Sequence, residues 1–247
     1  MPIVKIILFI ALAGLMPLSL RAEQEKTFAG FIDEIFADAE KQGVSQEILQ
    51  QARPQISLRK VFVKQDQAQF KPQSFAQYYA NKVNLRRLKR AKMKALKHQA
   101  VLAEIRAQYQ VPKAYILALW AIESDFGNFT GNYSVLNALA NLAFNQRRRD
   151  FFRGELLAAL KMLEMRVITP EAFKGSWAGA TGQSQFMPSS YMRFAVDFNQ
   201  NGKTDIWQEE PDILASIANY LSNYQWQINL PWGYDVKLNE AGKAYFN

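Results

Sequence analysis

The sequence predicts a mainly helical fold with at most a small β element. Apolar residues recur at spacings of three and four along most of the long segments, as one face of a helix requires. Serine precedes several of these segments and glycine or proline follows, as expected at helix ends. The 247 residues are 49% hydrophobic, which is enough to bury a core. We therefore expect one domain over residues 23–247.

The N-terminal half is expected to be helical apart from one segment. Apolar spacing predicts a helix over Phe28–Lys41, and Ser45 can cap a second helix that extends to Ala52. Residues 55–73 have a mixed pattern that ends at a proline, so we expect an extended or irregular segment there. Residues 75–109 return to helical composition, first aromatic and then strongly basic.

The C-terminal half is expected to hold the remaining helices. Pro112 fits a first helical turn and Gly127 fits a stop, so a helix is predicted over 111–127. Further helices are expected over 135–144 after the cap Ser134, over about 148–166, from Thr169-Pro170-Glu171 onward and over 213–224. The tail that follows, which includes Pro231-Trp232-Gly233, is expected to be loop or short strand.

Glu123 is the candidate catalytic residue of the helix predicted over 111–127. Ile116, Trp120 and Glu123 lie at i, i+4 and i+7, so the carboxyl shares a stripe with two large apolar side chains. We expect it to face inward with a raised pKa, which suits a general acid near neutral pH. The alternative is that Glu123 caps a groove or pairs with an arginine.

The chain offers few other groups for catalysis. It has no cysteine, which excludes disulfides, thiol nucleophiles and a lipidated cysteine, and His98 is its only histidine. Asp125 points to a different helix face from Glu123, and residues 126–149 contain no Asp or Glu. A distant carboxylate could fold into place, but a site with one carboxylate is the simplest interpretation. Such a site can cleave a glycosidic bond if a sugar hydroxyl attacks, which gives an anhydro-sugar.

Residues 1–22 have the features of a secretory signal peptide. Lys5 precedes an apolar run over 6–15 that is too short to span a bilayer comfortably, and small and polar residues follow. An uncleaved N-terminal membrane anchor is the alternative. We expect an exported protein that is soluble after signal cleavage.

Basic residues are concentrated in one part of the chain. The formal net charge is +8, and loss of the two cations Lys5 and Arg21 with the signal would leave +6. Eight cations lie within residues 82–97. The simplest interpretation is a solvated helix face; the favoured functional alternative is attraction to an anionic envelope polymer or membrane surface. We expect no nucleic-acid partner, since an exported protein rarely meets one.

Two loops carry polar groups that could bind ligands. In the glycine-rich loop over 174–184, Ser176, Gln183 and the following Gln185 offer groups suited to sugar hydroxyls and acetamides, although a turn-rich connector would have the same composition. Residues 197–208 match the start of a calcium loop through Asp197, Asn199, Asn201, Gly202 and Asp205. Position twelve holds Gln208 where a glutamate is expected, so a nearby carboxylate would have to replace it: Glu209, Glu210 or Asp212. The alternative is an Asn-Gly turn.

Eight short motifs follow one another between residues 108 and 236. They are ESDFG (123–127), LANLAF (139–144), RR followed by FF (147–152), GEL (154–156), GSWAGATG (175–182), QFMPSSY (185–191), AVD (195–197) and SIANY (216–220). In this order they closely resemble the lytic murein transglycosylase B family. The resemblance implies a lysozyme-like fold and an enzyme that cleaves the MurNAc–GlcNAc linkage of peptidoglycan without water. Its product carries a 1,6-anhydro-MurNAc end.

The resemblance also implies roles for individual residues. Glu123 corresponds to the catalytic glutamate, Ser176 and Gln185 to polar groups beside the cleaved linkage, and Tyr220 and Tyr78 to aromatics that shape the sugar site. The implied ligands of a structural calcium ion are Asp197, Asn199, Asn201, the Lys203 carbonyl and Asp212, although one extra residue precedes Asp212. Peptidoglycan strands are the implied substrate, other cell-wall enzymes are candidate partners, and a periplasmic monomer is expected.

One departure from the family concerns the C-terminus. Family members continue beyond the position of Asn247 into a segment that contributes a Tyr-Asn pair to the active site. The alternatives are a shortened member, a fragment, or a domain completed by a partner, and in each case we expect a more open cleft in this chain. The alternative function is therefore a non-catalytic peptidoglycan-binding or scaffold protein of the same fold. A hydrolytic muramidase is a third hypothesis.

Overall fold

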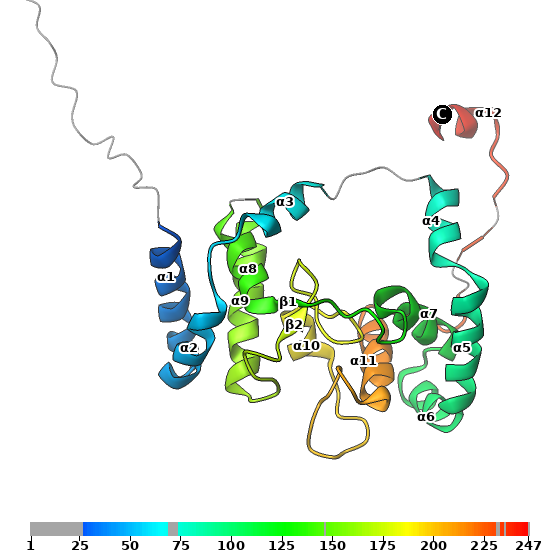
Figure 1. The fold of residues 1–247 in the computed structure, drawn as a ribbon. Helices are drawn as coiled ribbons and strands as arrows, with labels where there is room; N and C mark the ends of the chain where they lie inside the picture. The colour runs from blue at the N-terminus through cyan, green and yellow to red at the C-terminus, as the bar shows by residue number, and fades with distance from the viewer. Residues whose placement is uncertain (1–26, 69–73, 146, 231–232, 235, 247) are drawn as a thin grey trace, which may run out of the picture.

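Helices make up most of the regular structure in the computed structural model, which describes residues 27–68, 74–145, 147–230, 233–234 and 236–246 (Figure 1). The helices are α1 (Phe28–Lys41), α2 (Gln46–Ala52), α3 (Lys60–Ala68), α4 (Phe75–Lys82), α5 (Leu85–Lys97), α6 (Gln99–Tyr109), α7 (Lys113–Ser124), α8 (Val135–Phe144), α9 (Arg149–Glu164), α10 (Pro188–Phe194), α11 (Glu210–Asn223) and α12 (Glu240–Phe246), with a short 3-10 turn η1 (Arg53–Gln55). Strands β1 (Tyr133–Ser134) and β2 (Lys174–Gly175) form one small sheet. The predicted fold class is confirmed. The signal peptide expected over 1–22 lies outside the described residues.

Local capping explains where two of the predicted helices begin. Ser45 has extended backbone, and its hydroxyl accepts a hydrogen bond from the Ile48 N–H at the start of α2. Ser134 does the same for the Asn137 N–H at the start of α8. Both caps follow from the sequence, and both predictions are confirmed.

The prediction of an irregular segment over 55–73 is wrong, because residues Lys60–Ala68 form helix α3. Contacts from distant residues hold this helix in place. Phe62 is buried, and the fully buried Asp66 carboxylate accepts hydrogen bonds from Arg147 at 3.0 Å and Arg148 at 2.6 Å. Local sequence pattern could not show this, because the partners lie about 80 positions away.

Three other boundaries differ from the predictions. No helix follows Thr169: its hydroxyl accepts from the Ala172 N–H in a single turn, and the chain then enters β2. The tail contains helix α12 where loop or short strand was expected. Pro112 caps α7 from outside the helix, and α7 ends at Ser124, three residues before the predicted glycine stop.

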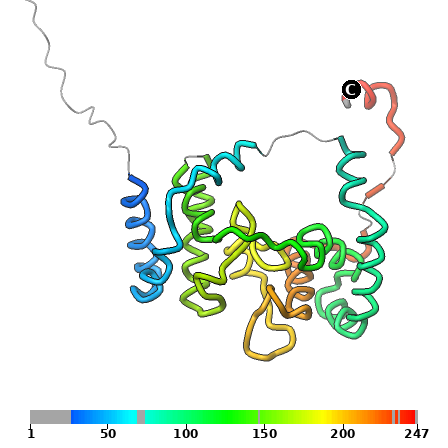
Figure 2. Tube along the Cα trace, in the orientation of Figure 1, coloured from blue at the N-terminus to red at the C-terminus, as the bar shows by residue number. Residues whose placement is uncertain are grey.

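The core is centred on α8 and α9. Helices α1 and α2 pack against α9, α3 packs against α8, and α10 joins α9 to α11. Helices α5, α6 and α7 pack against one another, and α11 contacts α6 and α7 (Figure 2). Trp120 of α7 and Leu139 of α8 are completely buried, so the apolar core extends through both groups of helices. Within the described chain, no helix is long and apolar enough to cross a bilayer.

Candidate active site

Glu123 lies in the last turn of α7. Our expectation that it faces inward is wrong, because its side chain is exposed whereas Ile116 and Trp120 are fully buried. Its pKa is nevertheless raised, because neighbouring protein atoms displace part of the water around the carboxyl. The Lys82 ammonium acts in the opposite direction and lowers this pKa. Glu123 is therefore an accessible carboxyl that holds its proton to higher pH than an ordinary glutamate.

Asp125 fixes the turn that follows Glu123. It has left-handed backbone with φ of 52°, and its buried carboxylate is held by Arg87 and Arg90 of α5. Burial opposes its ionisation, but hydrogen bonds from Arg90, Arg87 and Asn128 outweigh this effect and lower its pKa. Asp125 is thus a charged carboxylate whose partners are the arginines of α5.

The small sheet brings the loop after α7 next to the glycine-rich loop. Strand β1 pairs antiparallel with β2, Gly175 also bridges to Thr181, and Thr181 bridges to Phe186. A Cβ on Gly131, whose φ is +89°, would come within 2.1 Å of the Gly175 carbonyl oxygen, so only glycine fits at this approach. These contacts place Ser176 and Gln185 beside the segment that follows Glu123.

Ser176 and Gln185 are held by backbone groups. The Ser176 hydroxyl oxygen accepts from the Ala178 N–H at 3.3 Å and the Ala180 N–H at 3.1 Å, which leaves its hydroxyl hydrogen for a ligand. The Gln185 amide donates to the carbonyls of Thr130 at 3.0 Å and Gly182 at 2.9 Å. Its oxygen Oε1 has no hydrogen-bond partner in the described part of the chain, and can accept from a sugar.

Tyr220 links this loop to Glu123. Its half-buried ring lies 5.6 Å from the Phe186 ring, next to Gln185, and 4.7 Å from the Tyr224 ring. Burial raises the pKa of the Tyr220 hydroxyl, and Tyr224 and the negative charge of Glu123 raise it further. Since the charge of Glu123 reaches the Tyr220 hydroxyl, the two side chains belong to one electrostatic environment.

Both polar groups of the Gln183 side chain form hydrogen bonds within the fold, which removes this residue as a candidate sugar ligand. Its Oε1 accepts from the Trp120 indole N–H at 2.9 Å, and its Nε2 donates to the Trp207 carbonyl at 2.8 Å. Gly127 packs so closely on it that a Cβ would come within 2.3 Å of the same Oε1. Gln183 thus ties α7 to the glycine-rich loop.

Tyr78 is exposed on α4, and Lys82, which no sequence motif indicated, connects it to Glu123. The Lys82 ammonium lies 5.9 Å from the Tyr78 ring centre, and its charge acts on Glu123. The four-residue spacing of Tyr78 and Lys82 on one helix face was the available signal, but nothing local placed that face beside α7.

The loop over 197–208 is closed by its own polar groups. Asp197 accepts from the N–H groups of Asn201 and Gly202, at 3.1 and 2.8 Å. Asn199 and Asn201 both donate side-chain hydrogen bonds to Glu209, the latter at 3.0 Å. Lys203 donates its N–H to the Asn201 side-chain oxygen at 2.9 Å. The side-chain oxygens of Asp197, Asn199 and Asn201 thus accept hydrogen bonds from backbone N–H groups of the same loop.

The three carboxylates that could complete this loop lie in different places. Glu209 contacts the asparagine amides, whereas Glu210 is held by Lys94 at 2.6 Å and Lys97 at 2.7 Å. Asp212 is fully buried and accepts from the N–H groups of Phe198 and Asp205, each at 2.9 Å. Within the described residues, no cluster of three or more His, Cys, Asp or Glu forms a metal site, so any ion would depend on asparagine and carbonyl oxygens as well.

The chain belongs to the transglycosylase SLT domain family, whose model matches residues 27–247. It is 41% identical to the membrane-bound lytic murein transglycosylase B of Escherichia coli (strain K12) over 119 residues, which are 48% of this chain and 33% of that protein.

Solved structures of two lytic transglycosylases are also similar. Pseudomonas aeruginosa SltB3 in complex with NAG-NAM-pentapeptide is 33% identical, with a TM-score of 0.82 over 87% of this chain and 58% of that one. Escherichia coli Slt35 in complex with calcium is 30% identical, with a TM-score of 0.72 over 82% of this chain and 64% of that one. The chain thus spans one third of the curated relative and under two thirds of these two solved ones.

Proposed function

We propose that the protein is a lytic murein transglycosylase that cleaves the MurNAc-β-1,4-GlcNAc bond of peptidoglycan without water. The observation that carries the proposal is the position of the glycine-rich loop: the β1–β2 pairing and the hydrogen bond from Gln185 to the Thr130 carbonyl hold it against the segment that follows Glu123, an accessible carboxyl with a raised pKa. Membership of the transglycosylase family supports this interpretation. So does the similarity to SltB3, which has been solved with NAG-NAM-pentapeptide and with NAG-anhNAM-pentapeptide.

In the proposed reaction Glu123 acts twice. Its carboxyl gives a proton to the glycosidic oxygen, the bond from MurNAc C1 to that oxygen breaks, and GlcNAc leaves with a free 4-hydroxyl. The C6 hydroxyl of the same MurNAc then attacks C1, and the Glu123 carboxylate takes the hydroxyl proton. The new C1–O6 bond makes the 1,6-anhydro ring, and Glu123 ends protonated for the next cycle. The raised pKa favours the first step, and the accessible carboxylate can reach the second proton.

The neighbouring residues would orient the sugar. The Ser176 hydroxyl hydrogen can donate to the substrate and the Gln185 Oε1 can accept from a hydroxyl or an acetamide N–H. Tyr220 and Tyr78 offer aromatic surfaces on which sugar rings can pack. None of these four side chains has to move a proton in this mechanism.

The test is mass spectrometry of the muropeptides released from purified peptidoglycan. The native protein should release 1,6-anhydro ends, and Glu123→Gln should lower the rate by about a thousandfold, because it removes a general acid and base. Glu104→Gln is the matched control, since Glu104 is exposed on α6 and should leave the rate unchanged.

Three results would overturn the proposal. Equal release by native protein and Glu123→Gln would exclude Glu123 as the catalytic group. Reducing ends in place of anhydro ends would establish a hydrolase. Binding to peptidoglycan without any product would establish the alternative function, a non-catalytic peptidoglycan-binding protein.

We also propose that the loop over 197–208 binds a structural calcium ion. Its donor chemistry fits, since Asp197, Asn199, Asn201 and the Lys203 carbonyl supply the oxygen ligands that calcium prefers. Glu209 or Asp212 would complete the set. Slt35, a similar protein, has been solved with calcium. The ion would hold the loop that precedes α11 and would take no part in the chemistry.

Calcium at millimolar concentration should raise the melting temperature, while magnesium at equal ionic strength should not. Glu209→Gln and Asp212→Asn separate the two candidate ligands, because the variant that loses the calcium-dependent shift has lost a ligand. A melting temperature of the native protein that does not respond to calcium would contradict the proposal.

The expected location and partners stand as part of the same proposal. Export by the signal peptide expected over 1–22 would bring the protein to the periplasm, where peptidoglycan is its substrate. We propose a monomer there, with other cell-wall enzymes as further partners and no nucleic-acid partner.

A further inference from the structure

Helix α5 has an outer face on which large apolar side chains are exposed. Leu85, Leu88, Met93 and Leu96 expose 85%, 47%, 60% and 74% of their surface. Such side chains are usually buried in a helix that packs on a core. Four of them on one 13-residue helix therefore indicate a surface that is covered by a binding partner or lies in surroundings less polar than water.

The cations of α5 fall into two sets. On the inner side, Arg87 and Arg90 pair with Asp125, and Lys94 and Lys97 pair with Glu210. On the outer side, Arg86, Lys89 and Lys92 are exposed and have no acidic partner within the described chain. The inner cations are therefore paired with carboxylates of the fold, and the outer ones are not.

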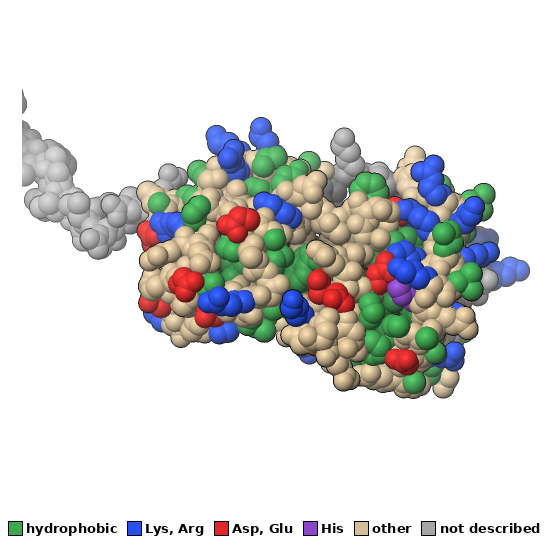
Figure 3. Space-filling view, turned by 60° about the horizontal axis from the view of Figure 1, so that its bottom comes forward, with side chains coloured by type: hydrophobic (Ala, Val, Ile, Leu, Met, Phe, Trp, Pro, Cys, Tyr) green, Lys and Arg blue, Asp and Glu red, His purple; other side chains and the backbone are tan. Residues whose placement is uncertain are grey.

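No acidic residue of the same segment balances the outer cations. Residues 67–103 contain no Asp or Glu. Figure 3 shows basic and apolar side chains next to each other at the right-hand end of the molecule, where α5 and α6 lie. The outer face of α5 thus combines uncompensated positive charge with exposed apolar surface.

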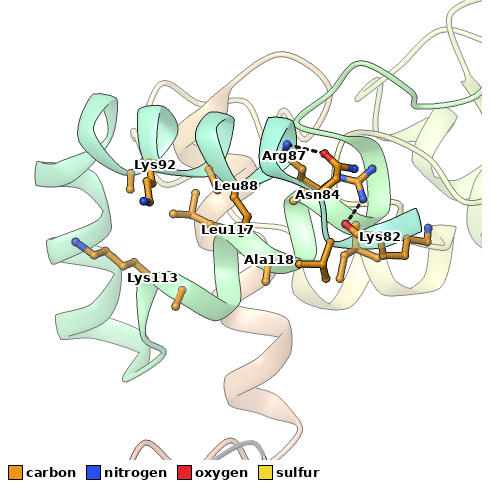
Figure 4. Close-up of a pocket in the computed structure, with 14 residues that line it drawn as sticks. Lys82, Asn84, Arg87, Leu88, Lys92, Lys113, Leu117 and Ala118 are labelled. Carbon is orange, nitrogen blue, oxygen red and sulfur yellow. Dashed lines mark hydrogen bonds between the residues drawn. The ribbon is translucent and has the colours of Figure 1, made fainter. Parts of the chain in front are cut away.

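A groove of about 350 Å³ between α5 and α7 continues this apolar surface (Figure 4). Leu88 of α5 and Leu117 and Ala118 of α7 line its floor, and Lys92 and Lys113 lie at one end of it. Among the residues that the structure describes, none with an acidic side chain lines it. A partner of this surface must therefore combine negative charge with apolar groups.

We propose that the outer face of α5 binds the surface of an anionic lipid bilayer. An amphipathic helix lies in the plane of a membrane when its apolar side chains enter the acyl boundary and its flanking lysines contact anionic headgroups. Leu85, Met93 and Leu96 supply the first kind of contact, and Arg86, Lys89 and Lys92 the second. A nucleic acid or an acidic glycan could satisfy the cations but would leave the leucines in water.

The experiment is flotation of the purified full chain with two kinds of vesicle. One contains phosphatidylcholine alone, and in the other about one third of the lipid is phosphatidylglycerol. The protein should float only with the anionic vesicles. Lys89→Glu/Lys92→Glu should lower the partition coefficient by more than about tenfold, since each lost or reversed charge removes attraction to the surface. Lys60→Glu/Lys64→Glu on α3 makes the same change of charge elsewhere and should float much more strongly than the α5 variant.

The apolar contribution is tested separately. Leu85→Ser/Met93→Ser/Leu96→Ser should also lose flotation by more than about tenfold, because the three most exposed apolar side chains of the face are then missing from the acyl region. Leu58→Ser/Val61→Ser removes exposed apolar side chains at another place and should not. Circular dichroism and the melting temperature establish that each variant is folded.

Two outcomes would overturn the inference. One is flotation that the serine substitutions on α5 leave unchanged, since this would mean binding by charge alone, as for an acidic polymer. The other is equal binding to neutral and anionic vesicles, or to neither. Failure of the catalytic proposal would be seen separately, because digestion of purified peptidoglycan contains no membrane and the α5 variants should retain full activity in it.

Discussion

Glu123 and Asp125 lie two residues apart and have opposite titration behaviour. Glu123 is exposed, yet its pKa is raised. Asp125 is only 8% exposed, yet its pKa is lowered. Displaced water disfavours the charged form of both carboxyls and by itself would raise both pKa values. The difference arises from partners: Asp125 accepts hydrogen bonds from two guanidinium groups, whereas Lys82 alone, among the charged side chains that the structure describes, lowers the pKa of Glu123.

This contrast shows how one helix end can serve two purposes. The left-handed turn at Asp125 is held by α5 through paired charges, so the last turn of α7 has a fixed direction. Glu123 is carried by that turn but makes no ion pair within the described residues, so it stays free to hold and release a proton. A group that stabilises the fold and a group that moves protons thus need opposite surroundings.

The largest expected effect on stability comes from breaking the Asp125 side of this contrast. Asp125→Asn removes the negative charge that Arg87 and Arg90 share and leaves them without compensation. We expect a loss of about 3 kcal/mol in the free energy of unfolding, measured by urea titration at pH 7. Asp150→Asn, at an exposed position of α9, is the control and should change it by less than about 0.5 kcal/mol. A folded Asp125→Asn variant of native stability would show that the pair does not hold the turn.

Glu210, in the first turn of α11, is a second carboxyl whose pKa is lowered by charged partners in spite of burial. Burial opposes the charge of Glu210, but hydrogen bonds from Lys94 and Lys97 and the charge of His98 outweigh it, and its pKa falls to about 2. A lowered pKa adds stability above the ordinary value of about 4.5, and this stability is lost as the pH falls toward 2. Glu210→Gln should therefore cost about 2 kcal/mol at pH 7, after an allowance for solvent screening, and progressively less below pH 4.5. A cost that does not change with pH would exclude the charge as its cause.

The same contrast explains what could be predicted from sequence. Ser45, Ser134 and the apolar spacing act within a few residues, so the helices that depend on them were predicted with nearly correct bounds. Helix α3 depends on pairs formed about 80 positions away, and the exposure of Glu123 depends on which elements pack beside α7. Neither could be seen in a local pattern.

The candidate site shows the same limit. Family motifs identified Ser176, Gln185 and Tyr220, which the structure brings to one region. They could not show that the Gln183 side chain accepts a hydrogen bond from the Trp120 indole. A glutamine that stabilises the fold and a glutamine that binds sugar are the same residue in the sequence. Lys82 was missed for a related reason, since its role depends on the groove that the end of α4 shares with α7.

Lys82→Met tests the cation that acts on Glu123. Without the ammonium, the pKa of Glu123 should rise further, so the high-pH limb of the rate profile should move to higher pH. At the optimum the rate should change by less than about fivefold, since Lys82 is partly exposed to solvent. Lys113→Met removes a lysine at the opposite end of the groove and should leave the profile in place. A profile that moves equally in both variants would show that net charge, and not Lys82, sets it.

The smallest expected effect is on the stability of Glu123→Gln, and its sign is opposite to that of Asp125→Asn. The folded pKa of Glu123 lies above its unfolded value, so the contribution of this group to stability is complete below the unfolded pKa and is lost as the pH rises through the folded one. At pH 7 the charge is therefore a cost, and its removal should raise the free energy of unfolding by less than about 1 kcal/mol, because solvent screens an exposed group. At pH 3, where glutamic acid is protonated in both states, the native protein and the variant should unfold alike. Thermal unfolding at the two pH values measures the difference. A loss of stability at pH 7 would mean that the Glu123 carboxylate makes a stabilising contact, and a residue held by such a contact would be a poor proton carrier.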